Sequence, residues 1–139
     1  MNEIRYKAHG NSVTCIKISD NNRFIFSAGN DHKLVIFNLP NRAIRSYKFD
    51  RPIKYLKKVN MKNCIGIIVL DNLNKGFLYN NGTTDIVEID VSQELIEESN
   101  QFIKDKQKLI NDDISALHST DILKATGMYN GEIVVCKNC

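Results

Sequence analysis

The chain has 139 residues, of which 42% are hydrophobic and 25% are charged, and its formal net charge is +3. This length and composition indicate one soluble domain with enough chain to bury a core. A net charge this small gives no indication of nucleic-acid or anionic-membrane binding. No apolar run approaches the ~20 residues of a membrane-spanning helix, and the N-terminal residues lack the apolar segment of a secretory signal. We therefore expect a cytoplasmic protein with no membrane association.

Short runs of β-branched and apolar residues fill the first third of the chain. Four of them lie at 13–18, 24–28, 33–37 and 44–49, and clusters of Asn, Asp, Gly and Pro separate them. These residue types favour turns because they accept or impose the backbone angles that turns need. Four short strands joined by such turns predict an antiparallel all-β architecture.

The same pattern recurs twice further along the chain. A second group of predicted strands lies at 53–59, 64–70, 76–79 and 86–91, and a third lies at 114–117, 122–126 and 132–136. One more segment, 4–7, precedes the first group, so that twelve strands are expected. With the stretch at 92–113 set aside as an insertion, the repeat is about 40 residues long, which is typical of the four-stranded blade of a β-propeller.

One segment, 92–110, breaks the β pattern. It has no Gly or Pro, and its apolar pairs begin at Leu95, Phe102 and Leu109, seven residues apart. This spacing places the pairs on one stripe of a helix. Ser92 is a suitable N-cap, and acidic residues precede basic ones along the segment, which complements the helix dipole. We therefore predict one inserted α-helix.

The motifs between the strands resemble the WD40 repeat family. The sequence reads His-Gly-Asn-Ser-Val at 9–13, Phe-Ser-Ala-Gly-Asn-Asp at 26–31 and Leu-Val-Ile-Phe-Asn-Leu at 34–39. These segments are similar to the family's His-x-x-x-Val, Ser-Gly-x-x-Asp and Ile-x-Ile-Trp-Asp pattern at matching spacing. The run at 125–135 resembles the pattern again, whereas the unit at 53–91 matches only in strand spacing.

The resemblance implies part of a WD40-type β-propeller of about three four-stranded blades spanning residues 1–139. The units fall at about 4–39, 44–80 and 86–138, with the helical insertion at about 92–110. Propellers close with 4–8 blades, so three units leave sheet edges and apolar blade faces uncovered. We expect either the remaining blades of a larger propeller or a partner protein to complete the ring. In the family, a leading strand such as 4–7 often pairs with the last blade.

Within a blade of this family, a loop His, a strand Ser or Thr, a turn Asp and the Trp N–H form a buried structural network. His9, Ser27 and Asp31 occupy the first three of these positions, and Phe37 stands in place of the Trp and has no donor to offer. The same three side-chain types could form a hydrolytic triad, but no Gly-x-Ser-x-Gly surrounds Ser27. The resemblance therefore implies a structural role, and we expect no enzymatic activity.

Two cysteines near the C-terminus, Cys136 and Cys139, form a Cys-x-x-Cys pair of the kind that can bind zinc or act in redox chemistry. A structural zinc site needs four ligands, and the sequence offers no second pair. We therefore expect no metal and no cofactor, and keep a metal- or redox-linked protein as an alternative. An RNA-associated protein is a second alternative, because a local basic cluster with Tyr55 interleaved is formed by Lys54, Lys57, Lys58 and Lys62.

The function that follows from the resemblance is a non-enzymatic WD-repeat scaffold that mediates protein–protein interactions within a larger assembly. The run at 125–133 looks like WD repeats of large ciliary and axonemal proteins, which implies a component of the axoneme or a similar cytoskeletal assembly. The stripe of Leu95, Phe102 and Leu109 either packs on the chain's own propeller or binds a partner. Nucleic acid is not expected among the partners.

Overall fold

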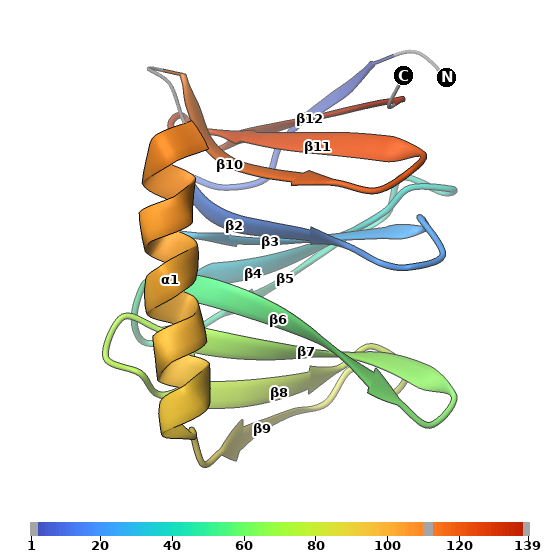
Figure 1. The fold of residues 1–139 in the computed structure, drawn as a ribbon. Helices are drawn as coiled ribbons and strands as arrows, with labels where there is room; N and C mark the ends of the chain where they lie inside the picture. Colours follow the sequence, from blue (N-terminus) through green and yellow to red (C-terminus); the bar gives the residue numbers. More distant parts are fainter. Residues whose placement is uncertain (1–2, 110–112, 138–139) are drawn as a thin grey trace.

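The computed structural model describes residues 3–109 and 113–137, which form twelve β-strands and one α-helix (Figure 1). The strands make three separate antiparallel sheets of four strands each. We call them the upper, middle and lower sheets after their positions in Figure 1. This arrangement confirms the predicted all-β class with three four-stranded blades and one inserted helix.

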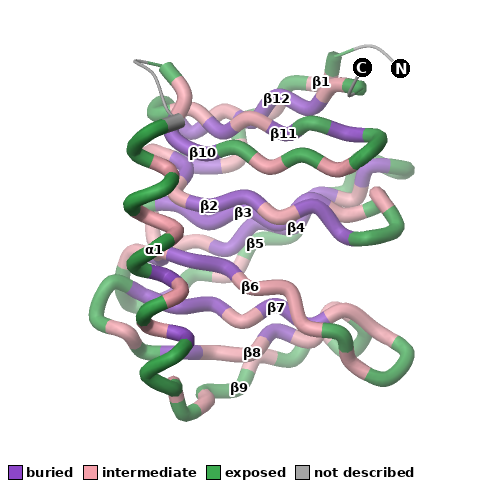
Figure 2. The backbone as a smooth tube through the Cα atoms, in the orientation of Figure 1, coloured by how far each residue is buried: buried purple, intermediate pink, exposed green. Residues whose placement is uncertain are grey.

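The middle sheet contains β2 (Val13–Ile18), β3 (Phe24–Gly29), β4 (Lys33–Asn38) and β5 (Ile44–Lys48), in that order. Neighbouring sheets cover both of its faces, so nearly every residue of β3 and β4 is buried (Figure 2). The near-continuous apolar sequence of these two strands suits burial on both faces.

The lower sheet contains β6 (Ile53–Met61), β7 (Cys64–Asp71), β8 (Gly76–Asn80) and β9 (Ile86–Ile89). Its face toward the middle sheet carries aromatic side chains. The ring of Tyr79 lies 5.2 Å from that of Tyr47, and the ring of Phe77 lies 5.0 Å from that of Phe49, between centroids. Tilted ring pairs at such distances are favourable, and these pairs belong to the core cluster that joins the two sheets.

The upper sheet contains β10 (Ile114–Ser119), β11 (Leu123–Met128), β12 (Glu132–Lys137) and, at its edge, β1 (Ile4–Lys7). β1 pairs antiparallel with β12, so that Ile4 lies opposite Val135. The first strand of the chain therefore completes the sheet made by the last three. A second core cluster, which includes the stacked rings of Tyr6 and Phe37, joins this sheet to the middle one.

The sheets stack in the order upper, middle, lower, although the chain forms the middle sheet first and the upper sheet last (Figure 1). The helix α1 (Gln93–Leu109) leads from β9 to β10 and passes one end of the middle sheet on its way (Figure 1). Each end sheet therefore has one face that no other described sheet covers, and the three sheets form an open stack.

The predicted helix at 92–110 is observed as α1, and the Ser92 hydroxyl accepts the backbone N–H of Leu95 at 3.2 Å. The units expected at about 4–39, 44–80 and 86–138 are offset from the sheets, because β1 lies in the upper sheet and β5 in the middle one. No helix of the described residues is both long enough and apolar enough to cross a bilayer.

Candidate protein-interaction surfaces

The structure brings three of the predicted network residues together. His9, in the loop after β1, lies with its Nδ1 2.9 Å from Asp31 Oδ1 and its Nε2 2.8 Å from Ser27 Oγ. A carboxylate only accepts hydrogen bonds, so His9 donates through Nδ1 and its Nε2 accepts the Ser27 hydroxyl proton. The backbone N–H of Gly10 also donates to Asp31, at 3.0 Å.

Burial decides what this network can do chemically. Burial lowers the pKa of His9 despite the neighbouring carboxylate, so the ring is neutral near pH 7. Burial alone would raise the pKa of Asp31, but the N–H of Gly10 and the His9 ring hold it below its usual value. His9 is 2% exposed and Ser27 is 0% exposed, so a substrate has no access to the hydroxyl. The arrangement suits a structural link between the β1–β2 loop and the β3–β4 turn.

The same loop is also tied to the upper sheet. The backbone N–H groups of Ala8 and His9 both donate to the carbonyl of Gly131, at 3.1 and 3.0 Å. Gly131 has φ of +91°, and a Cβ there would lie 1.9 Å from the His9 carbonyl oxygen. Only glycine fits this position. The fourth predicted residue, Phe37, lies apart from the network and stacks on Tyr6 at 4.2 Å between centroids.

The cysteine motif gains no support as a metal site. Cys136 lies half-buried on β12, and Cys139 lies outside the described residues. Across residues 3–109 and 113–137, no three His, Cys, Asp or Glu side chains gather as a metal-binding group. Cys15 is buried in the middle sheet, where burial raises the pKa of its thiol.

The apolar stripe of α1 faces the sheets. Leu95 is 8% exposed and belongs to the core cluster between the lower and middle sheets. The ring of Phe102 lies 5.0 Å from that of Tyr55 on β6. The side chain of Leu109 lies outside the described part of the structure. Sequence patterns could not show that polar contacts also hold the helix, such as the 2.9 Å bond from Tyr55 to Glu98.

The lysines that suggested RNA binding point in different directions. Lys57 donates to Glu98 on α1 at 3.1 Å. Lys58 turns toward the middle sheet, where it donates to Asp20 at 3.0 Å and to the Ile18 carbonyl at 2.9 Å. Two of the clustered positive charges are therefore engaged within the protein, and the fold does not gather them on one face.

The outer face of the lower sheet carries a row of aliphatic residues that begins beside Lys57 of β6. Ile68, Leu78 and Val87 lie side by side across β7, β8 and β9, on the face turned away from the middle sheet. Val87 is 54% exposed, and the other two are half-buried. Periodicity alone could not identify this face, because both faces of these strands carry apolar residues.

The outer face of the upper sheet differs. Leu117, Thr126 and Val134 lie in a row there, but Arg5 of β1 ends the row and reaches over it to the Met128 sulfur, at 3.7 Å. The other residues on this face include the charged side chains of Lys7, Lys124 and Glu132.

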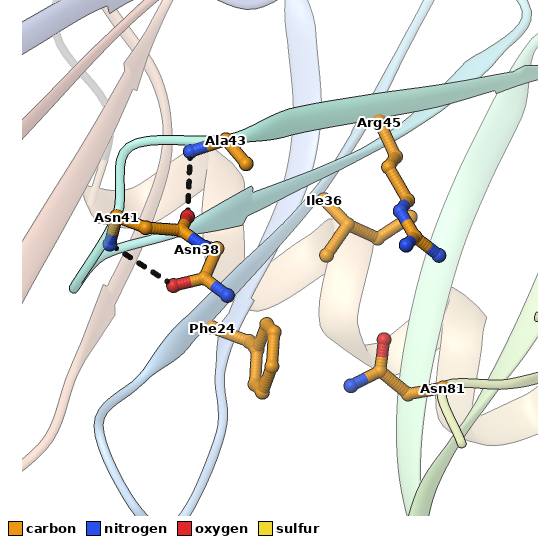
Figure 3. Close-up of a pocket in the computed structure, with 7 residues that line it drawn as sticks. All are labelled: Phe24, Ile36, Asn38, Asn41, Ala43, Arg45 and Asn81. Carbon is orange, nitrogen blue, oxygen red and sulfur yellow. Dashed lines mark hydrogen bonds between the residues drawn. The ribbon is translucent and has the colours of Figure 1, made fainter.

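A polar cavity opens where the middle and lower sheets meet, at the end of the stack away from α1 (Figure 3). Phe24 and Ile36 form an apolar wall, and Asn38, Arg45 and Asn81 supply polar groups. No motif in the sequence marks it, because its residues come from three strands and two turns.

No family model matches the sequence, and no curated protein matches it. Among solved structures, the chain is similar to the crystal structure of the WD40 β-propeller domain of Doa1, with a TM-score of 0.51 and 9% sequence identity. The match covers 91% of this chain and 37% of that one, so the chain spans just over a third of that domain's length. The three stacked sheets and this likeness show that the chain has the fold of part of a WD40-type β-propeller.

Proposed function

We propose that the protein is a non-enzymatic scaffold that binds other proteins within a larger assembly. The observation that carries this proposal is the aliphatic outer face of the lower sheet, where Ile68, Leu78 and Val87 have no described sheet over them. In a closed propeller, the next blade covers such a face. Here a partner protein, or the remaining blades of a larger propeller, would cover it.

Covering this face would stabilise the complex by burying apolar surface. Completing the burial of these half-exposed aliphatic side chains would contribute about 1 kcal/mol each. Contiguous apolar patches on a protein surface mark interaction sites more often than isolated apolar residues do. The buried positions of His9 and Ser27 support the non-enzymatic part of the proposal, because a nucleophile must be reachable.

The setting that we favour is a cytoplasmic assembly of the axonemal or cytoskeletal type. Its support is the run at 125–133, which covers the last four residues of β11, the following turn and the start of β12 and resembles WD repeats of large ciliary and axonemal proteins. Nucleic acid has less support, because Lys57 and Lys58 are paired within the fold.

The test places two lysines on the lower outer face, as Leu78→Lys with Val87→Lys, in the full chain. The tagged protein is recovered from extract of its native cells, and co-purified proteins are quantified by mass spectrometry. We expect one or more stoichiometric partners to be lost while circular dichroism and the unfolding midpoint stay close to those of the parent.

The matched control places two lysines on exposed apolar positions, as Leu117→Lys on β10 with Ile122→Lys in the turn before β11. This protein should keep the same partners. Sedimentation of the purified parent and of both variants separates a second copy of the chain from a different partner. A lower-face variant that is folded and retains every partner at the parent's level would refute the proposal.

A further inference from the structure

The cavity between the middle and lower sheets has a volume of about 210 Å³ (Figure 3). It lies where β4 turns into β5 and where β8 turns toward β9, which is the end of the stack opposite α1. It is separate from the outer face of the lower sheet, so it can bind a ligand whether or not that face is covered.

The first polar groups of the cavity are two asparagines whose orientation is fixed by the backbone. Asn38 Oδ1 accepts the N–H of Asn41 at 3.3 Å, and Asn41 Oδ1 accepts the N–H of Ala43 at 2.8 Å. A backbone N–H can be satisfied only by the oxygen of an amide, so the amide nitrogens of both side chains remain as donors. The nitrogen of Asn38 points into the cavity (Figure 3).

A third asparagine, Asn81 of the β8–β9 turn, has its side-chain amide oriented in the same way. Asn81 Oδ1 accepts the hydroxyl of Tyr79 at 3.1 Å. Burial raises the pKa of Tyr79, so this hydroxyl keeps its proton and remains a donor. The Asn81 nitrogen is therefore directed into the space beside the Phe24 ring (Figure 3). None of the three amide nitrogens donates to another described residue.

The only charged side chain lining the cavity is Arg45, on β5. It lies near the Tyr79 hydroxyl and forms no ion pair with an acidic side chain in the described parts of the chain. A guanidinium offers five N–H donors and no acceptor. Every polar side chain of the cavity thus presents donors, one of them cationic, beside an apolar wall of Phe24 and Ile36.

We propose that this cavity binds a carboxylate of a partner protein, namely the side chain of a glutamate or aspartate in an exposed segment. A carboxylate accepts up to four hydrogen bonds and can accept two at once from Arg45, with the asparagine amides completing its shell. The methylene groups that carry the carboxylate would lie against Phe24 and Ile36. Phosphorylated segments are usually recognised by clusters of arginines, whereas a single guanidinium matches the single charge of a carboxylate.

The test uses the full chain labelled with ¹⁵N and a short capped peptide, acetyl-Gly-Leu-Glu-Leu-Gly-amide. The side-chain amide signals of Asn38, Asn41 and Asn81 are followed as the peptide is added. We expect saturable shifts at these three residues. Arg45→Gln should weaken binding roughly tenfold or more, because it removes a hydrogen-bonded charge from the complex.

Two controls make the result specific. Arg51→Gln removes an exposed arginine in the loop between β5 and β6 and should leave the affinity unchanged. The peptide with Gln in place of Glu should not shift the asparagine signals. The same Gln peptide with a free C-terminal carboxylate tests the other source of this chemistry, and tighter binding of that peptide would overturn the assignment to a side chain. Equal binding of the capped Glu and Gln peptides, or full affinity in Arg45→Gln, would overturn the site itself.

Discussion

The upper and lower sheets pack on the middle sheet through buried side chains of different size. The lower junction is aromatic, with Tyr47 and Tyr79 in contact at its centre. The upper junction uses smaller side chains such as Ala125 and adds polar links, including the bond from the Ile18 N–H to the ring of His118 at 3.0 Å. Polar links cross the lower junction too, since Lys58 donates to Asp20 and to the Ile18 carbonyl, so the two junctions differ mainly in the share of aromatic side chains that they bury.

The outer faces of the upper and lower sheets also differ in their residues. The upper sheet ends the stack with charged residues such as Arg5 and Lys124, whereas the lower sheet ends it with Leu78 and Val87. Charged side chains remain hydrated on a free surface, but aliphatic ones gain from being covered. The lower outer face therefore gains more from being covered, which agrees with the proposal that a partner or further blades pack against it.

The largest effect should come from the aromatic junction. Tyr79→Ala removes a fully buried ring between the lower and middle sheets and should reduce the free energy of unfolding by about 3–5 kcal/mol. Guanidinium unfolding followed by circular dichroism measures this loss. Tyr129→Ala, at an exposed tyrosine in the turn between β11 and β12, should change it by less than about 0.5 kcal/mol. Equal losses in the two variants would contradict an aromatic lower junction.

The second-largest effect on stability should come from the network of His9, Ser27 and Asp31. Asp31→Ala leaves His9 Nδ1 and the Gly10 N–H without their acceptor and should cost about 1–3 kcal/mol. Asp31→Asn keeps one acceptor oxygen and should cost less. Thermal and chemical unfolding measure both variants, and an unchanged midpoint for Asp31→Ala would show that the network contributes nothing to the fold.

The third-largest effect should come from acid, which should weaken the packing of the upper sheet on the middle sheet. Burial, with help from the charges of Lys17 and Lys58 and against that of Asp20, lowers the pKa of His118 from 6.5 to about 4. The unfolded chain therefore binds a proton before the folded one as pH falls, so stability is full above pH 6.5 and declines toward pH 4.

The size of this decline is about 1 kcal/mol, because partial exposure of the ring screens the effect. Urea unfolding at intervals between pH 7 and pH 4 measures it. His118→Asn keeps an acceptor for the Ile18 N–H but does not titrate, so its stability should depend less on pH. The pKa of His9 is also lowered, so the stability of the variant should still fall somewhat as the pH falls. An identical pH profile for the variant would assign the effect to His9.

The smallest expected effect on stability is a gain rather than a loss. The Tyr6 hydroxyl is buried in the upper junction without a hydrogen-bond partner in the described structure. Tyr6→Phe keeps the ring stacked on Phe37 and removes the unsatisfied group, so it should leave the stability unchanged or raise it by up to about 1 kcal/mol. A clear loss of stability on differential scanning calorimetry would mean that the hydroxyl is satisfied in solution.

Local patterns predicted most of the fold. Alternating and continuous apolar runs located the strands, and a seven-residue spacing located α1 at 93–109 against an expected 92–110. The pairing of β1 with β12 also followed from the WD40 resemblance. These features depend on short-range propensity or on a repeated motif, and a single sequence carries both.

The candidate binding surfaces were harder to predict because they depend on how the sheets pack on one another. Whether Leu78 faces the core or solvent is decided by the side on which the middle sheet packs, and both faces of β8 are apolar. The cavity requires Asn81 of one sheet to meet Arg45 of another, and the distance between sheets is absent from the sequence. The network residues His9, Ser27 and Asp31 could be named beforehand only because a family motif already places them together.

The pairing of β1 with β12 has a consequence for folding. Lys7 lies opposite Glu132, so β1 leaves the ribosome long before β12, its pairing partner, has been made. The middle and lower sheets need only neighbouring segments and can form earlier, since short loops cost less entropy to close than long ones. In refolding followed by hydrogen exchange, the amides of β1 should be the last to gain protection. Until then the apolar residues Ile4 and Tyr6 stay exposed, and this is the period in which the chain is most open to misassembly.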